Sequence, residues 1–168
     1  MLFLGSKKFP EPNGFSELLS KFDGSSNAYT SCENTNYHFE ADHAGLVPCL
    51  EIFSRFFIDP LLAPEMIERE RHAIHSEHKK NIEQDQWRID RIFRDSYRPG
   101  HPRRKFSTGN LETLKNASHA EVSWFYNSFY GARRSKLTLL SKLPLATQKT
   151  LVTDLFLEAF PGEAKKEY

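Results

Sequence analysis

The sequence has no apolar run long enough to cross a membrane, and it has little cysteine. Residues 1–4 are apolar, but Gly5 and a pair of lysines follow closely, so the stretch is too short for a signal peptide or a membrane span. Only Cys32 and Cys49 occur, far apart and outside any CxxC motif. This usage is typical of a reducing compartment, so we expect a cytoplasmic protein without a membrane partner.

An excess of charge of one sign is also lacking. The 23 basic and 22 acidic side chains leave a net charge of +1, so no global field favours a nucleic acid partner. The basic run at 103–105 has no interleaved aromatic residue and is weak evidence for phosphate binding. No Gly-rich phosphate loop, no GxSxG motif and no convincing Cys–His pair is present. The nucleotide-binding and nucleophile-based enzyme classes with these motifs are therefore disfavoured.

What is present is the pattern of a globular chain. With 168 residues, 39% of them hydrophobic and 14 of them Phe, the chain is large enough for one domain with a core, which we assign to residues 1–168. Periodicity and turn residues predict helices at 14–22, 44–58, 65–94, 118–130 and 145–160, strands at 25–31, 35–41 and 136–141, and a frayed tail at 162–168. This order predicts an α/β or α+β fold, with a layer of helices against a mixed sheet whose remaining strands come from elsewhere.

The predicted helix at 65–94 contains neither Gly nor Pro, and Pro64 stands at its entry. Apolar side chains recur at helical spacing and predict one buried face made of Ile67, Ile74, Ile82, Ile89 and Phe93. Glu70 and Glu77 lie on the flank of that face with Asn81, separated by two turns or about 10.5 Å along the axis. A carboxylate beside a buried face loses part of its hydration, which costs free energy unless a cation pairs with it. A basic side chain and a metal ion both satisfy this condition, and the basic side chain is the commoner solution.

Three histidines lie on the same stretch, but their spacing is poor for a metal site. His72, His75 and His78 stand at i, i+3 and i+6, whereas a helical zinc pair is spaced i, i+4, as in HExxH. With a spacing of three residues, the three imidazole rings shift progressively around the helix and do not lie on one face. Solvated or otherwise satisfied histidines are therefore the simpler interpretation.

Four separated stretches carry a family pattern: residues 1–40, FFIDPL at 56–61, RERHAIHSEHKKN at 69–81 and PGHPRRKFSTGNLETL at 99–114. In sequence and in order they resemble the inverzincin zinc metallopeptidases of the insulinase family, the group of insulin-degrading enzyme, nardilysin and pitrilysin. The SEHKKN portion is closer to insulin-degrading enzyme, and KLTLLSKLPL at 136–145 is closer to nardilysin. The residues alone do not choose between these two subgroups.

The resemblance implies the two-layer fold of the first domain of these peptidases, which hydrolyse peptide bonds in unfolded peptides with Zn2+ as cofactor. The family holds zinc with HxxEH and a Glu from a later helix, and the Glu of HxxEH is the general base that activates the zinc-bound water. In the family, HxxEH is followed at once by a segment that matches residues 1–5. We therefore expect this chain to begin just after that motif, and we assign it no catalytic general base.

The resemblance assigns individual residues. Glu77 matches the acidic zinc ligand, and Glu70 matches a carboxylate that supports it. Asn27 and Ala28 match the edge strand that pairs with the peptide nearest the scissile bond. The aromatics that line side-chain pockets there match Phe3, Tyr29 and Trp87.

Two departures from the family pattern weaken parts of this assignment. Asp90 stands where insulin-degrading enzyme has an aromatic residue, which puts a preference for bulky apolar side chains in doubt. His72 and His75 replace the more usual residues around Glu77. The expected partners are peptide substrates and the remaining domains of the parent peptidase. The alternative is a non-catalytic relative that binds peptides as a subunit.

Overall fold

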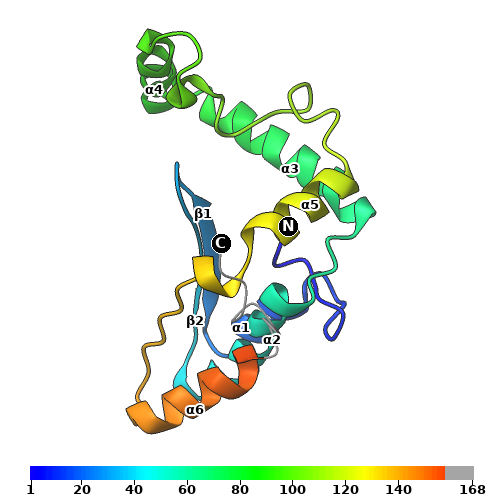
Figure 1. Ribbon diagram of the computed structural model, residues 1–168, viewed down its shortest axis with the longest axis vertical. Coiled ribbons are helices and arrows are strands. Elements are labelled where there is room, and N and C mark those ends of the chain that lie inside the picture. The colour runs from blue at the N-terminus through cyan, green and yellow to red at the C-terminus, as the bar shows by residue number, and fades with distance from the viewer. Residues whose placement is uncertain (158–168) are drawn as a thin grey trace. The chain divides into compact units, whose positions relative to one another are not determined.

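The computed structural model describes residues 1–157, and the chain folds into two compact units (Figure 1). The first unit comprises residues 1–62 together with the chain from residue 120 onward, and the second comprises residues 63–119. The end of the predicted helix at 158–160 and the predicted tail at 162–168 lie outside the described residues. The assignment of one domain to residues 1–168 stays a prediction.

The first unit is built on a β-hairpin. The strands β1 (Ser25–Thr30) and β2 (Thr35–Glu40) pair antiparallel, with Ala28 opposite Tyr37. Both predicted strands are thereby confirmed. Along β2, Tyr37 and Phe39 are half-buried and their neighbours are exposed. The alternation read from the sequence therefore gives the hairpin one face that packs on the core.

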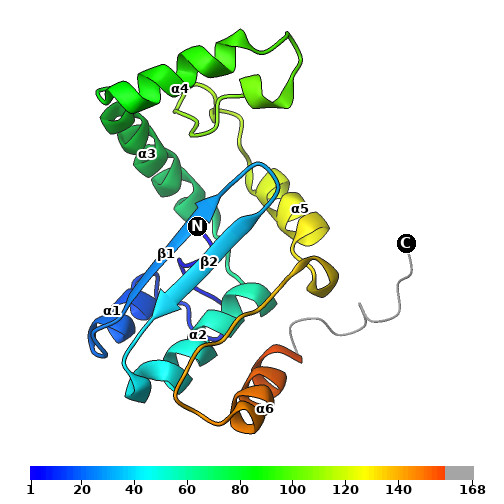
Figure 2. The same ribbon diagram turned by 90° about the vertical axis from the view of Figure 1, so that its left-hand side faces the viewer.

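Two helices cover that face of the hairpin, α1 (Gly14–Ser20) and α2 (Leu46–Ile58), and the short turn η1 (His43–Gly45) leads into α2 (Figure 2). The buried side chains at their centre are Leu2, Phe15, Leu19, Cys49, Leu50, Phe53 and Phe56. Phe15 and Phe53 contact Phe39 of β2, with ring centroids 5.8 and 5.0 Å apart. A layer of helices on a sheet is the predicted α+β arrangement.

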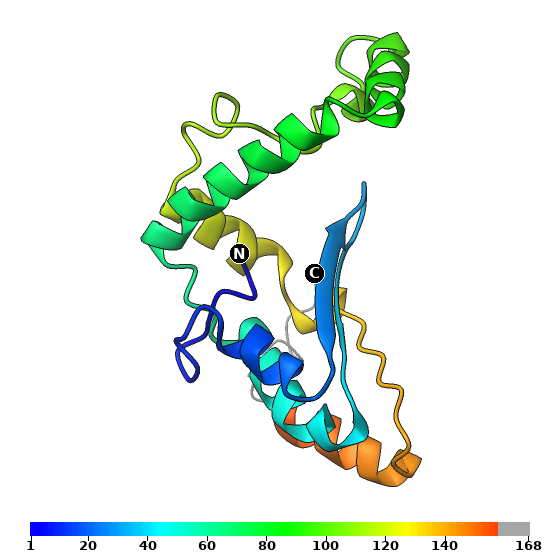
Figure 3. The ribbon, with the colours of Figure 1, turned by 180° about the vertical axis from the view of Figure 1, so that it is seen from behind.

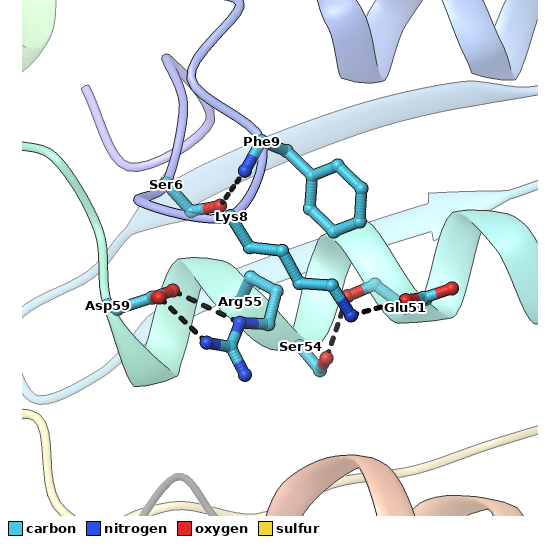
Figure 4. A network of polar contacts seen from close by, with 7 residues as sticks. All are labelled: Ser6, Lys8, Phe9, Glu51, Ser54, Arg55 and Asp59. Carbon is cyan, nitrogen blue, oxygen red and sulfur yellow. Dashed lines mark hydrogen bonds and ion pairs between the residues drawn. The ribbon is translucent and has the colours of Figure 1, made fainter.

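Polar contacts fasten the N-terminal segment to α2 (Figure 4). The Lys8 Nζ atom lies 2.7 Å from Glu51 Oε1, and the backbone N–H of Lys7 donates to the carbonyl of Asp59. Arg55 pairs with Asp59 at 2.7 Å and so stabilises the end of the helix. The first two contacts hold residues 7 and 8 against α2 and the residue that follows it.

Gly5 makes this arrangement possible, and we expect Gly5→Ala to lower the free energy of unfolding by about 2 kcal/mol or more. Its φ is +114°, and a Cβ atom there would lie 2.9 Å from the carbonyl oxygen of Pro10. Both the backbone and a neighbouring carbonyl would have to move. Urea unfolding measures the effect, with Gly100→Ala as the control because its φ is also positive but a Cβ there meets nothing within 4 Å. Equal losses in the two variants would contradict the steric part of the argument.

The remaining helices of the first unit are α5 (His119–Phe129) and α6 (Leu145–Phe156), with the short turn η3 (Ala132–Arg134) between them. Tyr130, just after α5, shares a 2.7 Å hydrogen bond with the Tyr37 hydroxyl of β2. Burial first, and this hydrogen bond second, raise the pKa of Tyr37 above its usual value. The Tyr37 hydroxyl therefore stays protonated, and its hydrogen bond links the residue that follows α5 to the hairpin.

The predicted strand at 136–141 is wrong. Within residues 1–157 the sheet has two strands, and 136–141 is not one of them. Leu139 packs against the core, while Leu137 and Leu140 are exposed. The alternation is present in the sequence, but a strand also requires a neighbour for its backbone hydrogen bonds.

The second unit contains α3 (Pro64–Asn81), α4 (Asp85–Ser96) and the short turn η2 (Pro102–Arg104). The predicted single helix at 65–94 is therefore wrong. The chain turns sharply between α3 and α4 (Figure 3), where Gln84 takes an extended conformation with φ −100° and ψ 129°. The Ile82 carbonyl, which a continuous helix would satisfy from within, accepts instead from Nε of Arg88 at 2.8 Å.

The break also corrects the predicted buried face. Only Ile67 is buried and Ile74 is half-buried, while Ile82, Ile89 and Phe93 are exposed. A helical stripe is buried only where another element covers it, and the turn at 82–84 ends the continuity on which the prediction relied. In the part of the chain that the structure describes, no helix has the length and apolar character to cross a membrane.

Candidate functional site

The outer edge of β1 offers backbone groups for a further strand. The N–H of Ser31 donates to the carbonyl of Asn34 at 2.8 Å, which identifies that pair as hydrogen-bonded across the hairpin. Because such pairs alternate in an antiparallel ladder, Asn27 and Tyr29 bond to β2, and the backbone groups of Ala28 point outward with those of residues 26 and 30. Within residues 1–157 no third strand occupies this edge.

One side chain already uses the central donor of this edge. Oδ1 of Asn27 accepts a 2.8 Å hydrogen bond from the N–H of Ala28, and both residues are exposed. A peptide that pairs with Ala28 must displace this contact. Asn27 and Ala28, which the resemblance matched to the same edge strand, are adjacent on β1 but differ in role. Ala28 offers its backbone N–H for strand pairing, and the side-chain oxygen of Asn27 competes with a peptide for that N–H.

The two predicted pocket aromatics of the first unit differ in their surroundings. Tyr29 on β1 is 57% exposed. Phe3 is half-buried, and its ring lies 5.3 Å from that of Phe56 and 5.6 Å from those of Phe15 and Tyr37. Phe3 is therefore part of the core cluster, whereas Tyr29 is free to meet a ligand.

The predicted carboxylates lie on α3 in the second unit. Glu77 is exposed, and no hydrogen bond or ion pair with any residue from 1 to 157 engages its carboxylate. Glu70 is half-buried and has an interaction partner. Glu68 of the same helix is held by Arg71 at 2.6 Å and by His72 at 3.4 Å. Among these three, Glu77 is the carboxylate that remains available to a cation.

The described residues do not by themselves form a metal site. No group of three or more His, Cys, Asp or Glu side chains in residues 1–157 is placed to hold a metal ion, and a catalytic zinc requires about three protein ligands. Of the α3 histidines, His72 faces Glu68, and His78 packs edge-on against Phe106 at 4.9 Å. Glu77 offers one unengaged carboxylate, so the described residues do not complete a zinc site by themselves, and no catalytic step is assigned through a metal.

Trp87 lines a pocket that lies within the second unit. The pocket has a volume of about 310 Å³ and is formed by the end of α3, by α4 and by residues 106–108. Its apolar walls include Trp87, Ile82 and Phe106. Asp90 also lines it and accepts a hydrogen bond from Nε of Arg94. Asp90, which the resemblance matches to an aromatic position, therefore forms an ion pair with the guanidinium of Arg94.

Asn81 is the residue of this pocket that the sequence did not identify as functional. It is only 8% exposed, and its buried Nδ2 atom has no hydrogen-bond partner among residues 1–157. An unpaired buried donor of this kind costs about 1–3 kcal/mol. The helical phase placed Asn81 beside the apolar face, but its burial comes from the tertiary fold.

The predicted site residues are thus divided between the units. Phe3, Asn27, Ala28 and Tyr29 belong to the first unit, and Glu70, Glu77 and Trp87 belong to the second. In the first unit, Asn27, Ala28 and Tyr29 lie on β1, whereas Phe3 packs against the core. In the second unit, the three residues lie on α3 and α4.

Comparisons with known proteins show which family this chain resembles. Residues 1–105 match the family described as Insulinase (Peptidase family M16). The A-factor-processing enzyme of Saccharomyces cerevisiae is 43% identical over 93% of this chain and 16% of its own length. A Schizosaccharomyces pombe protein named as a zinc protease, mug138, is 39% identical over 93% of this chain and 17% of its own length. The crystal structure of pitrilysin superposes with a TM-score of 0.89 and 30% identity, over 99% of this chain and 18% of that one.

Proposed function

Because this chain belongs to the insulinase family, peptidase family M16, we propose that it is the part of a zinc metalloendopeptidase that binds an extended peptide and supplies one carboxylate to the metal. The family is one of peptidases, and zinc is its metal. The chain spans about one sixth of the length of the relatives it matches. Hydrolysis of unfolded peptides and cooperation with further peptidase domains are therefore part of the proposal.

The observation that supports peptide binding most directly is the outer edge of β1. The backbone groups of residues 26, 28 and 30 point away from β2, residue 26 being half-buried and residues 28 and 30 exposed. An extended peptide that adds as a strand pairs with such groups whatever its side chains. This mode suits an enzyme that acts on unfolded peptides. Tyr29, which is exposed beside Ala28, is a further contact for the peptide.

The supporting role toward zinc rests on Glu77. Its carboxylate is exposed and unengaged by residues 1–157, on the helix where the family resemblance places the acidic ligand. We assign Glu70, half-buried two turns earlier, to the support of that position. The general base and the histidine ligands are assigned outside the residues of this chain, which contains no HxxEH motif.

A second candidate is a non-catalytic subunit of the same family that binds peptides without cleaving them. It shares the β1 edge, so peptide binding does not separate the two functions. The separating measurement is hydrolysis of a fluorogenic peptide by the longest natural protein that contains this chain. Cleavage that a chelator abolishes and zinc restores supports the enzyme. Binding without cleavage supports the subunit.

We also propose a cytoplasmic location. Cys32 is exposed and Cys49 is buried, and neither forms a disulfide in the structure. Burial raises the pKa of the Cys49 thiol, which keeps it protonated and unreactive. Unpaired cysteines of this kind are typical of a reducing compartment.

Peptide binding at β1 is tested by Ala28→Pro, which we expect to raise the Kd of an unstructured peptide about 10-fold or more, because proline removes the central outward donor and its ring obstructs strand pairing. The measurement is fluorescence anisotropy with a labelled peptide. Ala28→Ser keeps the N–H and should bind within about 2-fold of the parent. Asn27→Ala frees the Ala28 N–H from its internal acceptor and should tighten binding about 2- to 5-fold. Equal Kd values for Ala28→Pro and Ala28→Ser would contradict strand addition.

A further inference from the structure

We propose that Ser107 is a phosphorylation site for a protein kinase that selects arginine ahead of its acceptor serine. Ser107 closes the sequence RRKFS at 103–107 and lies in the loop that follows η2. The kinase brings ATP and Mg2+ in its own active site. The proposal goes beyond peptide binding and does not depend on it.

The position of Arg104 sets Ser107 apart from the other hydroxyl side chains. Of all the serines and threonines in the 168 residues, only Ser107 has an arginine three places before it. Because an extended chain rises about 3.3 Å per residue, the two Cα atoms would lie about 10 Å apart in a kinase groove. A guanidinium that pairs with groove carboxylates at that distance fixes which hydroxyl meets the ATP. Lys105 adds charge that an acidic groove attracts.

The backbone of the loop at 106–109 is free to enter such a groove. Within residues 1–157, no hydrogen bond joins its N–H and C=O groups to another residue, and the loop is neither helix nor strand. Ser107 is exposed, and its hydroxyl has no hydrogen-bond partner in the described chain. An extended conformation at 106–109 therefore breaks no hydrogen bond of these residues.

The contacts of Arg104 are long and are replaced at small cost. Its Nη1 atom lies 3.4 Å from the carbonyl oxygen of Tyr97, and its Nη2 atom lies 3.9 Å from Oδ1 of Asp95. The first distance exceeds the usual range for such a hydrogen bond, and a partly exposed ion pair contributes little. A carboxylate of a kinase can therefore take the place of both partners.

Two other hydroxyl side chains near basic residues lack one of these features. Thr108 has a lysine three places before it and is half-buried. Ser135 directly follows two arginines, but its Oγ atom already donates to the carbonyl of Gly131 at 2.8 Å. Ser107 combines the arginine at the required distance with an exposed and unengaged hydroxyl.

The reaction transfers the γ-phosphoryl group of ATP to Oγ of Ser107. A bond forms between Oγ and the γ-phosphorus, and the bond from that phosphorus to the oxygen bridging to the β-phosphate breaks. ADP leaves, and the hydroxyl proton passes to the catalytic aspartate of the kinase. The product adds a charge of about −1.5 to −2 at pH 7. It therefore offsets much of the positive charge of the three basic residues at 103–105.

The experiment is phosphorylation of the folded 168-residue chain by the catalytic subunit of cAMP-dependent protein kinase with ATP and Mg2+. Tandem mass spectrometry of the product locates the phosphate. We expect phosphate at Ser107 and none in Ser107→Ala, a substitution that removes no hydrogen bond of the described chain. Thr108→Val should be phosphorylated within about 2-fold of the parent rate, because it leaves Arg104 and Ser107 in place.

Arg104→Gln tests the recognition and should lower kcat/KM for phosphorylation about 10-fold or more. The matched control is Arg69→Gln, which removes the same charge at an exposed position of α3 and should change kcat/KM less than about 2-fold. A capped peptide of residues 100–112, with and without the Arg104→Gln change, gives the effect of the arginine free of any change in folding.

Three results would overturn the proposal. The first is phosphate confined to residues other than Ser107. The second is equal kcat/KM for the parent and Arg104→Gln peptides. The third is phosphorylation of the parent peptide without phosphorylation of the folded chain, which would show that the fold withholds the loop from the kinase.

Discussion

Glu77→Gln is expected to weaken zinc binding by at least about 100-fold in a protein that joins residues 1–168 to a segment with an HxxEH motif. A neutral amide is a poor zinc ligand, and the site loses one of about three protein ligands together with a negative charge. The exposed, unengaged carboxylate of Glu77 on α3 is the structural basis for the expectation. Competition with a chromophoric chelator measures the affinity without relying on catalysis.

Two other glutamates of α3 serve as controls. Glu70→Gln should cost less, about 10- to 100-fold, which is the usual effect of losing a residue that supports a metal ligand. Glu65→Gln, at an exposed position in the first turn, removes the same charge and should have little effect. If all three variants bound zinc as the parent does, Glu77 would not be a ligand.

Phe56→Ala is expected to lower the free energy of unfolding by about 3–5 kcal/mol. The ring is 1% exposed and lies 5.2 Å from Phe15, 5.3 Å from Phe3 and 6.5 Å from Phe53. Its removal leaves a cavity where α2, α1 and the N-terminal segment meet. Since a domain of this size has a net stability of about 5–15 kcal/mol, much of the folded state of the first unit depends on this side chain.

Urea unfolding followed by far-UV circular dichroism measures the effect, and Phe93→Ala is the matched control. Phe93 on α4 is 66% exposed, so the same chemical change should cost about 1 kcal/mol or less. A similar loss in both variants would mean that Phe56 is not the centre of a packed core. Phe3 should also become more mobile in Phe56→Ala, which sharper or shifted resonances of its ring would show.

The sequence by itself determined the helices and strands that follow from local residue patterns. The alternation of Tyr37 and Phe39 predicted β2, and the apolar spacing at 44–58 predicted α2, because in each case one face of the element packs on the core. The family motifs also assigned Glu77 and the β1 edge to the site, and that assignment stays a prediction. These features depend on residues that are near neighbours in the chain.

Only the tertiary structure decided the features that depend on distant partners. The helix at 65–94 breaks at 82–84 without Gly or Pro, and the Arg88 side chain satisfies the carbonyl that the break exposes. The alternating residues at 136–141 form no strand, because hydrogen bonds to a neighbouring strand are lacking there. Asn81 is buried, and its Nδ2 atom has no hydrogen-bond partner among residues 1–157, which no local pattern signals. Backbone hydrogen bonds and the burial of side chains depend on contacts across the whole fold, so the same local sequence pattern forms a helix or strand in one surrounding and not in another.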